Sequence, residues 1–178
     1  MIDISSKDLL EKLFENFKGK NIILNFSDLF ARKYNLNTKL VLSFIEDEPH
    51  NISSIVSPSF SFALEENGRN FDRKLTPPSK ELGFFNSYVW EKYSSSYLHS
   101  PTHSFTLAWG TKENSINNRN FTSAFGEDST LKYLIKNDFY QVQIGTPLMH
   151  SFYIAHYVEQ KERVPYRKIK NFKVNIYD

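Results

Sequence analysis

Cysteine is absent from this chain of 178 residues. Without a thiol the chain can form no disulfide framework, no thiolate nucleophile and no thiolate metal site. Covalent catalysis through a cysteine is therefore excluded. The glycine patterns of phosphate-cradling loops are missing as well, since neither GxxxxGK nor GxGxxG occurs. Nucleotide binding through those two kinds of loop is excluded.

The chain also lacks a large excess of charge of one sign and has no long apolar run. Lys and Arg number 22 against 20 for Asp and Glu, so the formal charge of +2 creates no field that would recruit nucleic acid or an acidic membrane. No stretch of 18 apolar residues occurs, and acidic residues interrupt the first 15 positions, where a signal peptide needs an apolar core. We expect a cytoplasmic protein with a small-molecule partner, without nucleic acid or membrane.

Histidine is another residue type that commonly forms metal sites. Five histidines occur, at positions 50, 99, 103, 150 and 156, but no HExxH pattern or other recognised ligand spacing is present. We expect no metal.

Aromatic residues are frequent, with 16 Phe and 10 Tyr, and can supply much of a core. Helical and strand patterns alternate along the chain, and Ser5, three residues before Asp8, is placed to cap the first helix. The polar stretch 65–80 is expected to be a long loop. The sequence predicts an α/β fold, one domain over residues 1–178, with a mixed sheet covered by helices. Helices are expected near 8–17, 36–45, 82–90, 129–135 and 154–158, and strands near 21–26, 52–56, 105–109 and 142–144.

Histidines and carboxylates near strand ends and helix starts are the candidate catalytic residues. His156 and Glu159 are three apart on an expected helix, so the carboxylate could orient the imidazole or could merely form a surface pair. His103 could be a general base or could bond its own loop. Glu127 and Asp128 could act in a site or could simply favour the start of a helix.

Several short segments, taken in order, resemble those of the aminoglycoside 3-N-acetyltransferase family. The similarity covers roughly residues 8–167 and includes no GNAT-type glycine loop. The segments are PTHS at 101–104, FGEDS at 125–129, GTPL at 145–148, HYVE at 156–159, VPYR at 164–167, SPSF at 57–60 and the loop 72–79.

The resemblance implies a fold distinct from that of GNAT enzymes, and direct transfer of acetyl from acetyl-CoA to an amine. His156 is then the general base, with Glu127 and Glu159 as catalytic carboxylates. His103 is a second candidate that contacts the pantetheine or the thioester carbonyl. The other residues expected to bind the cosubstrate are Ser27, Thr102 and Ser104, and those expected to bind the acceptor are Asp72 and Asp128.

The chain departs from the family pattern at two places. A VHSSL-like strand end that helps to hold CoA keeps only Ser27 here, and the chain stops at Asp178, before the segment that commonly supplies a carboxylate for the histidine. Glu127, Glu159 or Asp178 could replace that carboxylate. With a shortened acceptor side, a smaller amino sugar is favoured over a polycationic aminoglycoside. We expect a nucleotide-linked amino sugar used for surface polysaccharide.

Other functions stay open on the sequence. The chain could be a non-catalytic relative that serves as a binding or regulatory subunit, or a resistance enzyme that modifies aminoglycosides. It could also use another acyl donor or a non-sugar amine. A homo-oligomer in which two chains complete each other's sites is a further possibility.

Overall fold

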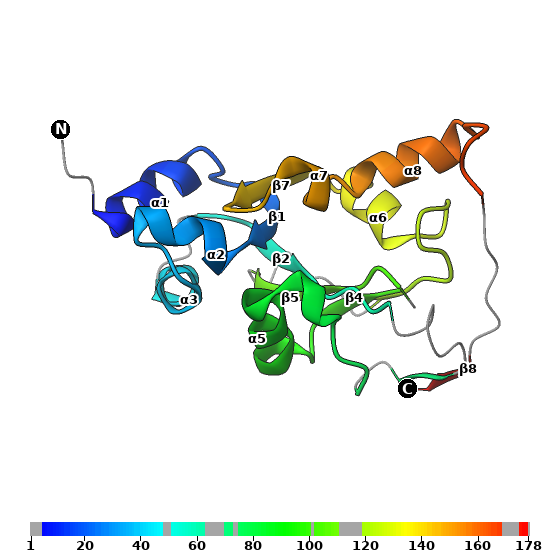
Figure 1. Cartoon of the computed structure of the whole chain (residues 1–178), viewed down its shortest axis with the longest axis horizontal. Helices are drawn as coiled ribbons and strands as arrows, with labels where there is room; N and C mark the ends of the chain where they lie inside the picture. The colour runs from blue at the N-terminus through cyan, green and yellow to red at the C-terminus, as the bar shows by residue number, and fades with distance from the viewer. Residues whose placement is uncertain are drawn as a thin grey trace.

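The structure is a computed structural model that describes residues 5–47, 51–62, 70–72, 75–100, 102–110, 119–168 and 175–177. Its helices are α1 (Ser6–Glu15), α2 (Asp28–Ala31), α3 (Thr38–Asp47), α5 (Phe84–Tyr93), α6 (Thr130–Lys136), α7 (Leu148–Ser151) and α8 (Ile154–Lys161), with 3-10 turns η1 (Arg32–Tyr34) and η2 (Lys80–Leu82). Its strands are β1 (Asn21–Phe26), β2 (Ser54–Pro58), β3 (Asn70–Asp72), β4 (Tyr97–His99), β5 (Phe105–Gly110), β6 (Arg119–Asn120), β7 (Phe139–Ile144) and β8 (Asn175–Tyr177). Figure 1 shows their arrangement.

Six strands form a mixed sheet in the order β6-β4-β5-β2-β1-β7. Strand β1 is parallel to both β2 and β7, whereas β5 is antiparallel to β2 and to β4. Strands β3 and β8 form a separate parallel pair. The parallel strands β1, β2 and β7 end at the same edge, which is where ligands commonly bind to α/β sheets.

Helices cover the sheet on both faces, so β1 is apolar along almost its whole length. Ile22 and Leu24 pack with α1, α3 and α5, whereas Ile23, on the other face, packs with α6 and α8. In Figure 1, α1 and α3 lie toward the N-terminal side and α6 and α8 toward the opposite side. The prediction of an α/β fold with a mixed sheet covered by helices is confirmed.

Local signals explain two of the helices. The Ser5 hydroxyl accepts the N–H of Asp8 at 3.1 Å and caps α1, and the Ser129 hydroxyl accepts the N–H of Lys132 at 3.1 Å and caps α6. One prediction was wrong. Part of the stretch 65–80 is not loop, because residues 70–72 form β3 and pair with β8.

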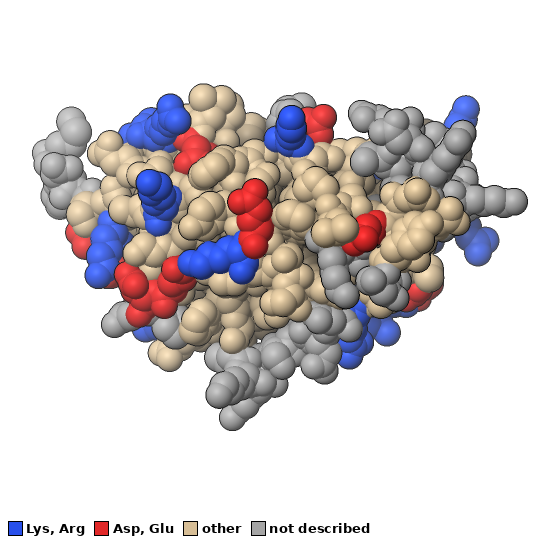
Figure 2. Space-filling model, turned by 90° about the horizontal axis from the view of Figure 1, so that it is seen from below, with Lys and Arg blue, Asp and Glu red and all other residues tan. Residues whose placement is uncertain are grey.

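Charges of both signs lie close together on the surface. Figure 2 shows Lys and Arg beside Asp and Glu on the face seen from below. Between two of the helices, Lys92 of α5 binds Glu46 of α3 at 2.5 Å, and Tyr93 donates its hydroxyl to the same carboxylate. Within the described residues no helix is both long and apolar enough to cross a membrane.

Candidate active site

The loop that follows β4 carries Thr102, His103 and Ser104, all buried. The Ser104 hydroxyl accepts the N–H of Ser100 at 3.1 Å and donates to the carbonyl of Ser100 at 2.7 Å. The Thr130 hydroxyl, in the first turn of α6, donates to the carbonyl of His103 at 2.6 Å. Ser104 therefore closes the loop, and Thr130 fixes it to α6.

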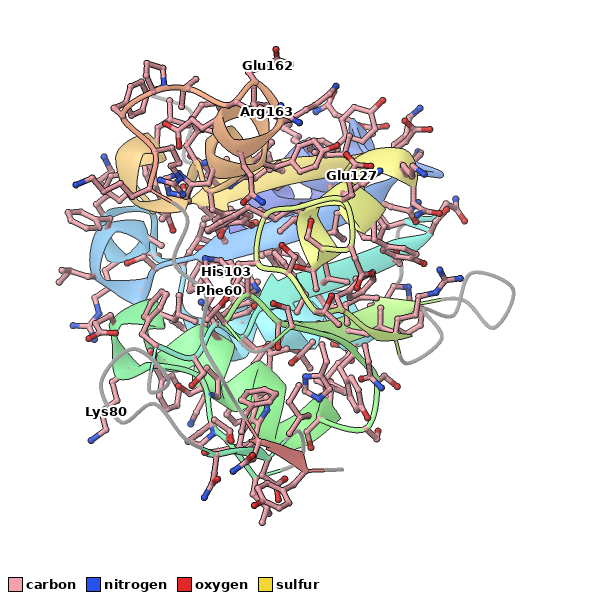
Figure 3. The ribbon with its side chains drawn as sticks, turned by 90° about the vertical axis from the view of Figure 1, so that its right-hand side faces the viewer. Phe60, Lys80, His103, Glu127, Glu162 and Arg163 are labelled. Carbon is pink, nitrogen blue, oxygen red and sulfur yellow. The ribbon has the colours of Figure 1, made fainter. Side chains whose placement is uncertain are left out.

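The imidazole of His103 is enclosed by aromatic rings. The side chain belongs to a residue only 8% exposed, and its ring centroid lies 4.6 Å from that of Phe60 and 4.4 Å from that of Phe125. Figure 3 shows His103 and Phe60 next to each other. Burial, with a smaller effect of nearby positive charges, lowers the pKa of His103 to about 3. His103 is therefore neutral at physiological pH and a weak base, which argues against a general-base role.

His156 and Glu159 share one face of α8, as their spacing predicts. Nδ1 of His156 lies 2.9 Å from Oε2 of Glu159, and Nη1 of Arg167 lies 3.2 Å from the same oxygen. The Tyr166 hydroxyl donates to Oε1 at 3.3 Å. The hydrogen bond with His156, and after it the charge of Arg167, lowers the pKa of Glu159. An ionised carboxylate in this place can orient the imidazole.

Phe125 joins the two histidines, a contact that the sequence did not predict. Its ring centroid lies 4.4 Å from that of His103 and 5.2 Å from that of His156. The guanidinium of Arg167 lies 5.2 Å from the same ring. The only signal in the sequence was the position of Phe125 at the start of the segment 125–129. The two histidines thus belong to one cluster, although they come from different elements.

Glu127 and Asp128 have partners at the start of α6. Glu127 forms an ion pair with Lys132, and in Figure 3 it lies apart from His103. Oδ2 of Asp128 accepts the N–H of Thr122 at 3.0 Å and its hydroxyl at 2.6 Å. Of the two glutamates expected in catalysis, Glu159 is the one that the structure places against His156.

Ser27 lies in the wall of a pocket of about 590 Å³ at the carboxyl ends of β1 and β7. This volume is ordinary for a site that holds a small molecule. The residues that line the pocket come from 25–32, 81–86 and 146–151. They include neither Thr102 nor His103 nor Ser104, so the structure does not bring all the residues expected at the cosubstrate into one pocket.

A row of buried side chains leads from this pocket to the histidines. Asn25, in the pocket wall, lies 3.4 Å from the hydroxyl of Tyr153, and the Tyr153 ring packs on Phe60 at a centroid distance of 5.1 Å. Phe60 in turn contacts His103. The pocket and the histidine cluster are therefore connected through a chain of buried contacts.

Asp72 lies in β3, in the separate two-stranded sheet. Its Oδ1 accepts the N–H of Leu75 at 2.8 Å, and its own N–H donates to the Thr76 hydroxyl at 2.9 Å. These bonds link Asp72 to Leu75 and Thr76. A role for Asp72 in binding the acceptor stays a prediction.

Some residues considered in the sequence lie outside the described residues. They are Pro101, His50 and Asp178, together with the side chain of His150. Among the residues that the structure describes, no three His, Asp or Glu side chains gather in a way that could hold a metal ion.

The fold and the cluster define a class of protein: an α/β protein with a histidine–carboxylate pair whose chemistry suits proton transfer. The sequence pattern of the family described as aminoglycoside 3-N-acetyltransferase matches residues 40–178. The chain belongs to this family and is an acetyltransferase. No curated protein matches the chain by sequence.

Solved structures share the fold. The YokD protein from Bacillus subtilis is 22% identical with a TM-score of 0.67, and the match covers 96% of this chain and 73% of that one. AAC-IIIb, solved with CoASH, is 13% identical with a TM-score of 0.65 over 97% and 75% of the two chains. AAC-VIa, solved with sisomicin, is 14% identical with a TM-score of 0.64 over 87% and 64%. This chain thus spans about two thirds to three quarters of their lengths.

Proposed function

We propose that this protein transfers the acetyl group of acetyl-CoA to the amine of an amino sugar, with His156 as general base. The observation that carries the proposal is the contact between Nδ1 of His156 and the carboxylate of Glu159. A hydrogen bond from Nδ1–H to an ionised carboxylate leaves Nε2 to accept a proton. The family and the CoASH-bound structure of AAC-IIIb support acetyl-CoA as the cosubstrate.

The reaction needs one base and no covalent enzyme intermediate. The amine nitrogen attacks the thioester carbonyl carbon, and Nε2 of His156 takes the proton that the nitrogen loses. The C–S bond then breaks, and the proton held on Nε2 passes to the sulfur, so that CoA leaves as the thiol and the imidazole is neutral again. A base whose pKa lies near the working pH commonly contributes about 10² to 10⁴ in rate. The pocket beside Ser27 is the proposed place of the CoA arm.

The two glutamates expected in catalysis already have charged partners, which favours an acceptor with few positive charges. Glu127 is paired with Lys132, and Glu159 with His156 and Arg167, so neither is left to receive an ammonium group alone. A polycation needs several such groups. We therefore propose a nucleotide-linked amino sugar of surface polysaccharide synthesis as the acceptor. The cytoplasmic location and a possible homo-oligomer stay predictions.

Calorimetric titration with acetyl-CoA and with CoA is the first experiment. Saturable binding at micromolar concentration is expected, and no binding of either compound would favour a non-catalytic relative. An acceptor screen then compares nucleotide-linked amino sugars with sisomicin, which AAC-VIa binds. Efficient acetylation of sisomicin would show that the acceptor is an aminoglycoside and would contradict the proposal of a small amino sugar.

Substitution His156→Ala tests the base. It should abolish turnover and leave CoA affinity nearly unchanged, because a general base acts mainly in the transition state. His103→Ala is no matched control, since that ring is buried. Turnover at the wild-type rate in His156→Ala would exclude the assignment.

A further inference from the structure

The chain turns back sharply after α8 and returns alongside it. Arg163 has a left-handed backbone, with φ at 51°, and the N–H of Val164 donates to the carbonyl of Glu159 at 3.1 Å. The N–H of Arg167 donates to the carbonyl of Val164 at 3.1 Å. Figure 3 shows Arg163 at the far end of α8, where this turn begins. The turn brings Arg167 back to the carboxylate of Glu159.

The Glu159 carboxylate is shared between three side chains. Its Oε2 faces both Nδ1 of His156 and Nη1 of Arg167, and its Oε1 accepts from Tyr166. The three side chains that meet at Oε2 are partly exposed, 41% for His156, 24% for Glu159 and 28% for Arg167. A partly exposed glutamate would sample more rotamers without a permanently charged partner. Arg167 supplies that partner, and its planar guanidinium fixes direction better than an ammonium can.

Contacts of Arg167 close a ring of four side chains. Its guanidinium lies 5.2 Å from the centroid of Phe125, and Phe125 packs edge-on against His156 at 5.2 Å and 66°. Phe125 comes from the loop before α6, Arg167 from the turn after α8, and the other two from α8. Because each member contacts the next, a displacement of Arg167 would displace the imidazole both through Glu159 and through Phe125.

We propose that Arg167 is a positioning residue for His156: it fixes the Glu159 carboxylate against Nδ1 and so keeps Nε2 as the nitrogen that accepts the proton. This inference rests on the proposed function. In water a neutral imidazole populates both tautomers, and only one of them presents a free Nε2. Arg167 touches neither substrate nor cosubstrate in this proposal and acts through Glu159.

The charged and titratable groups around His156 determine in which direction the pH dependence of the rate should shift when Arg167 is removed. They are Glu159 on α8, Tyr166 and Arg167 after the turn, and neutral His103 behind Phe125. Helix α6 packs on α8, and the charged groups at its start, Glu127, Asp128 and Lys132, are bound to one another or to Thr122. The positive charge of Arg167 opposes a positive imidazole, whereas the Glu159 carboxylate stabilises it. Without Arg167 only the carboxylate acts, so the protonated imidazole is favoured. The acid limb of the rate profile should therefore move to higher pH.

The kinetic experiment compares Arg167→Ala and Arg167→Lys with the wild type. We expect Arg167→Ala to lower kcat roughly 10- to 100-fold, the range found when a partner that orients a metal-bound histidine is removed, with little change in KM for acetyl-CoA. Arg167→Lys keeps the charge, so it should keep the acid limb and recover part of kcat. Lys168→Ala is the matched control, because it removes one positive charge from the next, exposed residue. Wild-type kcat in Arg167→Ala would overturn the proposal.

A double-mutant cycle tests whether Arg167 acts through Glu159. The variants are Glu159→Ala, Arg167→Ala and the pair together. If Arg167 works through the carboxylate, the pair should be no slower than Glu159→Ala alone. Losses that multiply, or a kcat loss in Arg167→Ala that leaves the pH profile unmoved and follows a lower Tm, would show an independent structural role and overturn the proposal.

A readout that needs no turnover separates this inference from the proposed function. Long-range ¹H–¹⁵N spectra of the imidazole, recorded where the ring is neutral, report which nitrogen carries the proton. We expect the Nδ1–H tautomer of His156 in the wild type and in Lys168→Ala, and a mixture in Arg167→Ala. The same tautomer in Arg167→Ala as in the wild type would overturn the role of Arg167. A wild type with the expected tautomer but no acetyl transfer would instead overturn the proposed function.

Discussion

The buried imidazole of His103 should make folding sensitive to acid. Its pKa is lowered to about 3 in the folded protein, mainly because burial disfavours the charged ring. In the unfolded chain an ordinary histidine binds a proton near pH 6.5. Between these two values the unfolded state binds more protons, so the free energy of unfolding falls as the pH falls, by up to about 1.4 kcal/mol per pH unit from this residue.

Denaturant unfolding of the wild type and of His103→Asn at several pH values from 7 to 4 would measure this contribution. The variant should be less stable at pH 7, because it loses ring contacts with Phe60 and Phe125. The free energy of unfolding of the variant should nevertheless fall less steeply than that of the wild type as the pH is lowered. Parallel curves for the two proteins would mean that His103 takes up a proton in the folded state.

Sequence spacing predicted one contact in the site and missed the others. His156 and Glu159 could be paired because residues three apart on a helix are neighbours. Phe125 and Arg167 could not be added, because their contacts depend on how a loop and a turn fold. The turn contains Arg163 in a left-handed conformation, for which its residue type gives no signal.

At the scale of elements, length decided what the sequence could predict. Strand β1 and helix α6 were predicted because an apolar run and the capping residue Ser129 mark them. Strands β4 and β6 and helices α2 and α7 have only two to four residues. Such short segments show no periodicity, and their structure depends on partners elsewhere in the fold.

Gly145 follows β7 in the chain and packs against α2, and no side chain fits there. Its φ is +69°, and a Cβ would lie 2.7 Å from the carbonyl oxygen of Ser27 and 2.8 Å from the backbone nitrogen of Ala31. Gly19 has nearly the same backbone, with φ at +67°, but nothing lies within 4 Å of its Cβ position. Gly19 is therefore a control that carries the backbone strain without the clash.

We expect Gly19→Ala to cost about 1 kcal/mol of stability from backbone strain. Gly145→Ala should cost roughly 1–3 kcal/mol more, because backbone atoms of α2 must move. Ser27 and the start of α2 line the pocket, so the affinity for acetyl-CoA should fall about tenfold in Gly145→Ala and stay unchanged in Gly19→Ala. Equal affinities in the two variants, measured by calorimetry, would place the cosubstrate away from this pocket.

At the scale of the whole molecule, the pocket joins parts of the chain that are far apart in sequence. Its walls come from the β1–α2 connection, from the start of α5 and from the segment between β7 and α7. These parts pack on different strands and helices, so a ligand that contacts all three opposes their separation. Binding should therefore stabilise the fold as a unit rather than one local element.

Thermal unfolding with and without acetyl-CoA tests this coupling. A ligand at about 100 times its Kd adds about 2.7 kcal/mol if it binds only the folded state. For a chain of this size each kcal/mol raises Tm by roughly 2–4 °C, so we expect an increase of about 5–10 °C. At the same ligand concentration Gly145→Ala should show a smaller increase than Gly19→Ala, because only the former has a distorted pocket. An unchanged wild-type Tm at saturating acetyl-CoA would contradict the donor site, since preferential binding to the folded state must raise the free energy of unfolding.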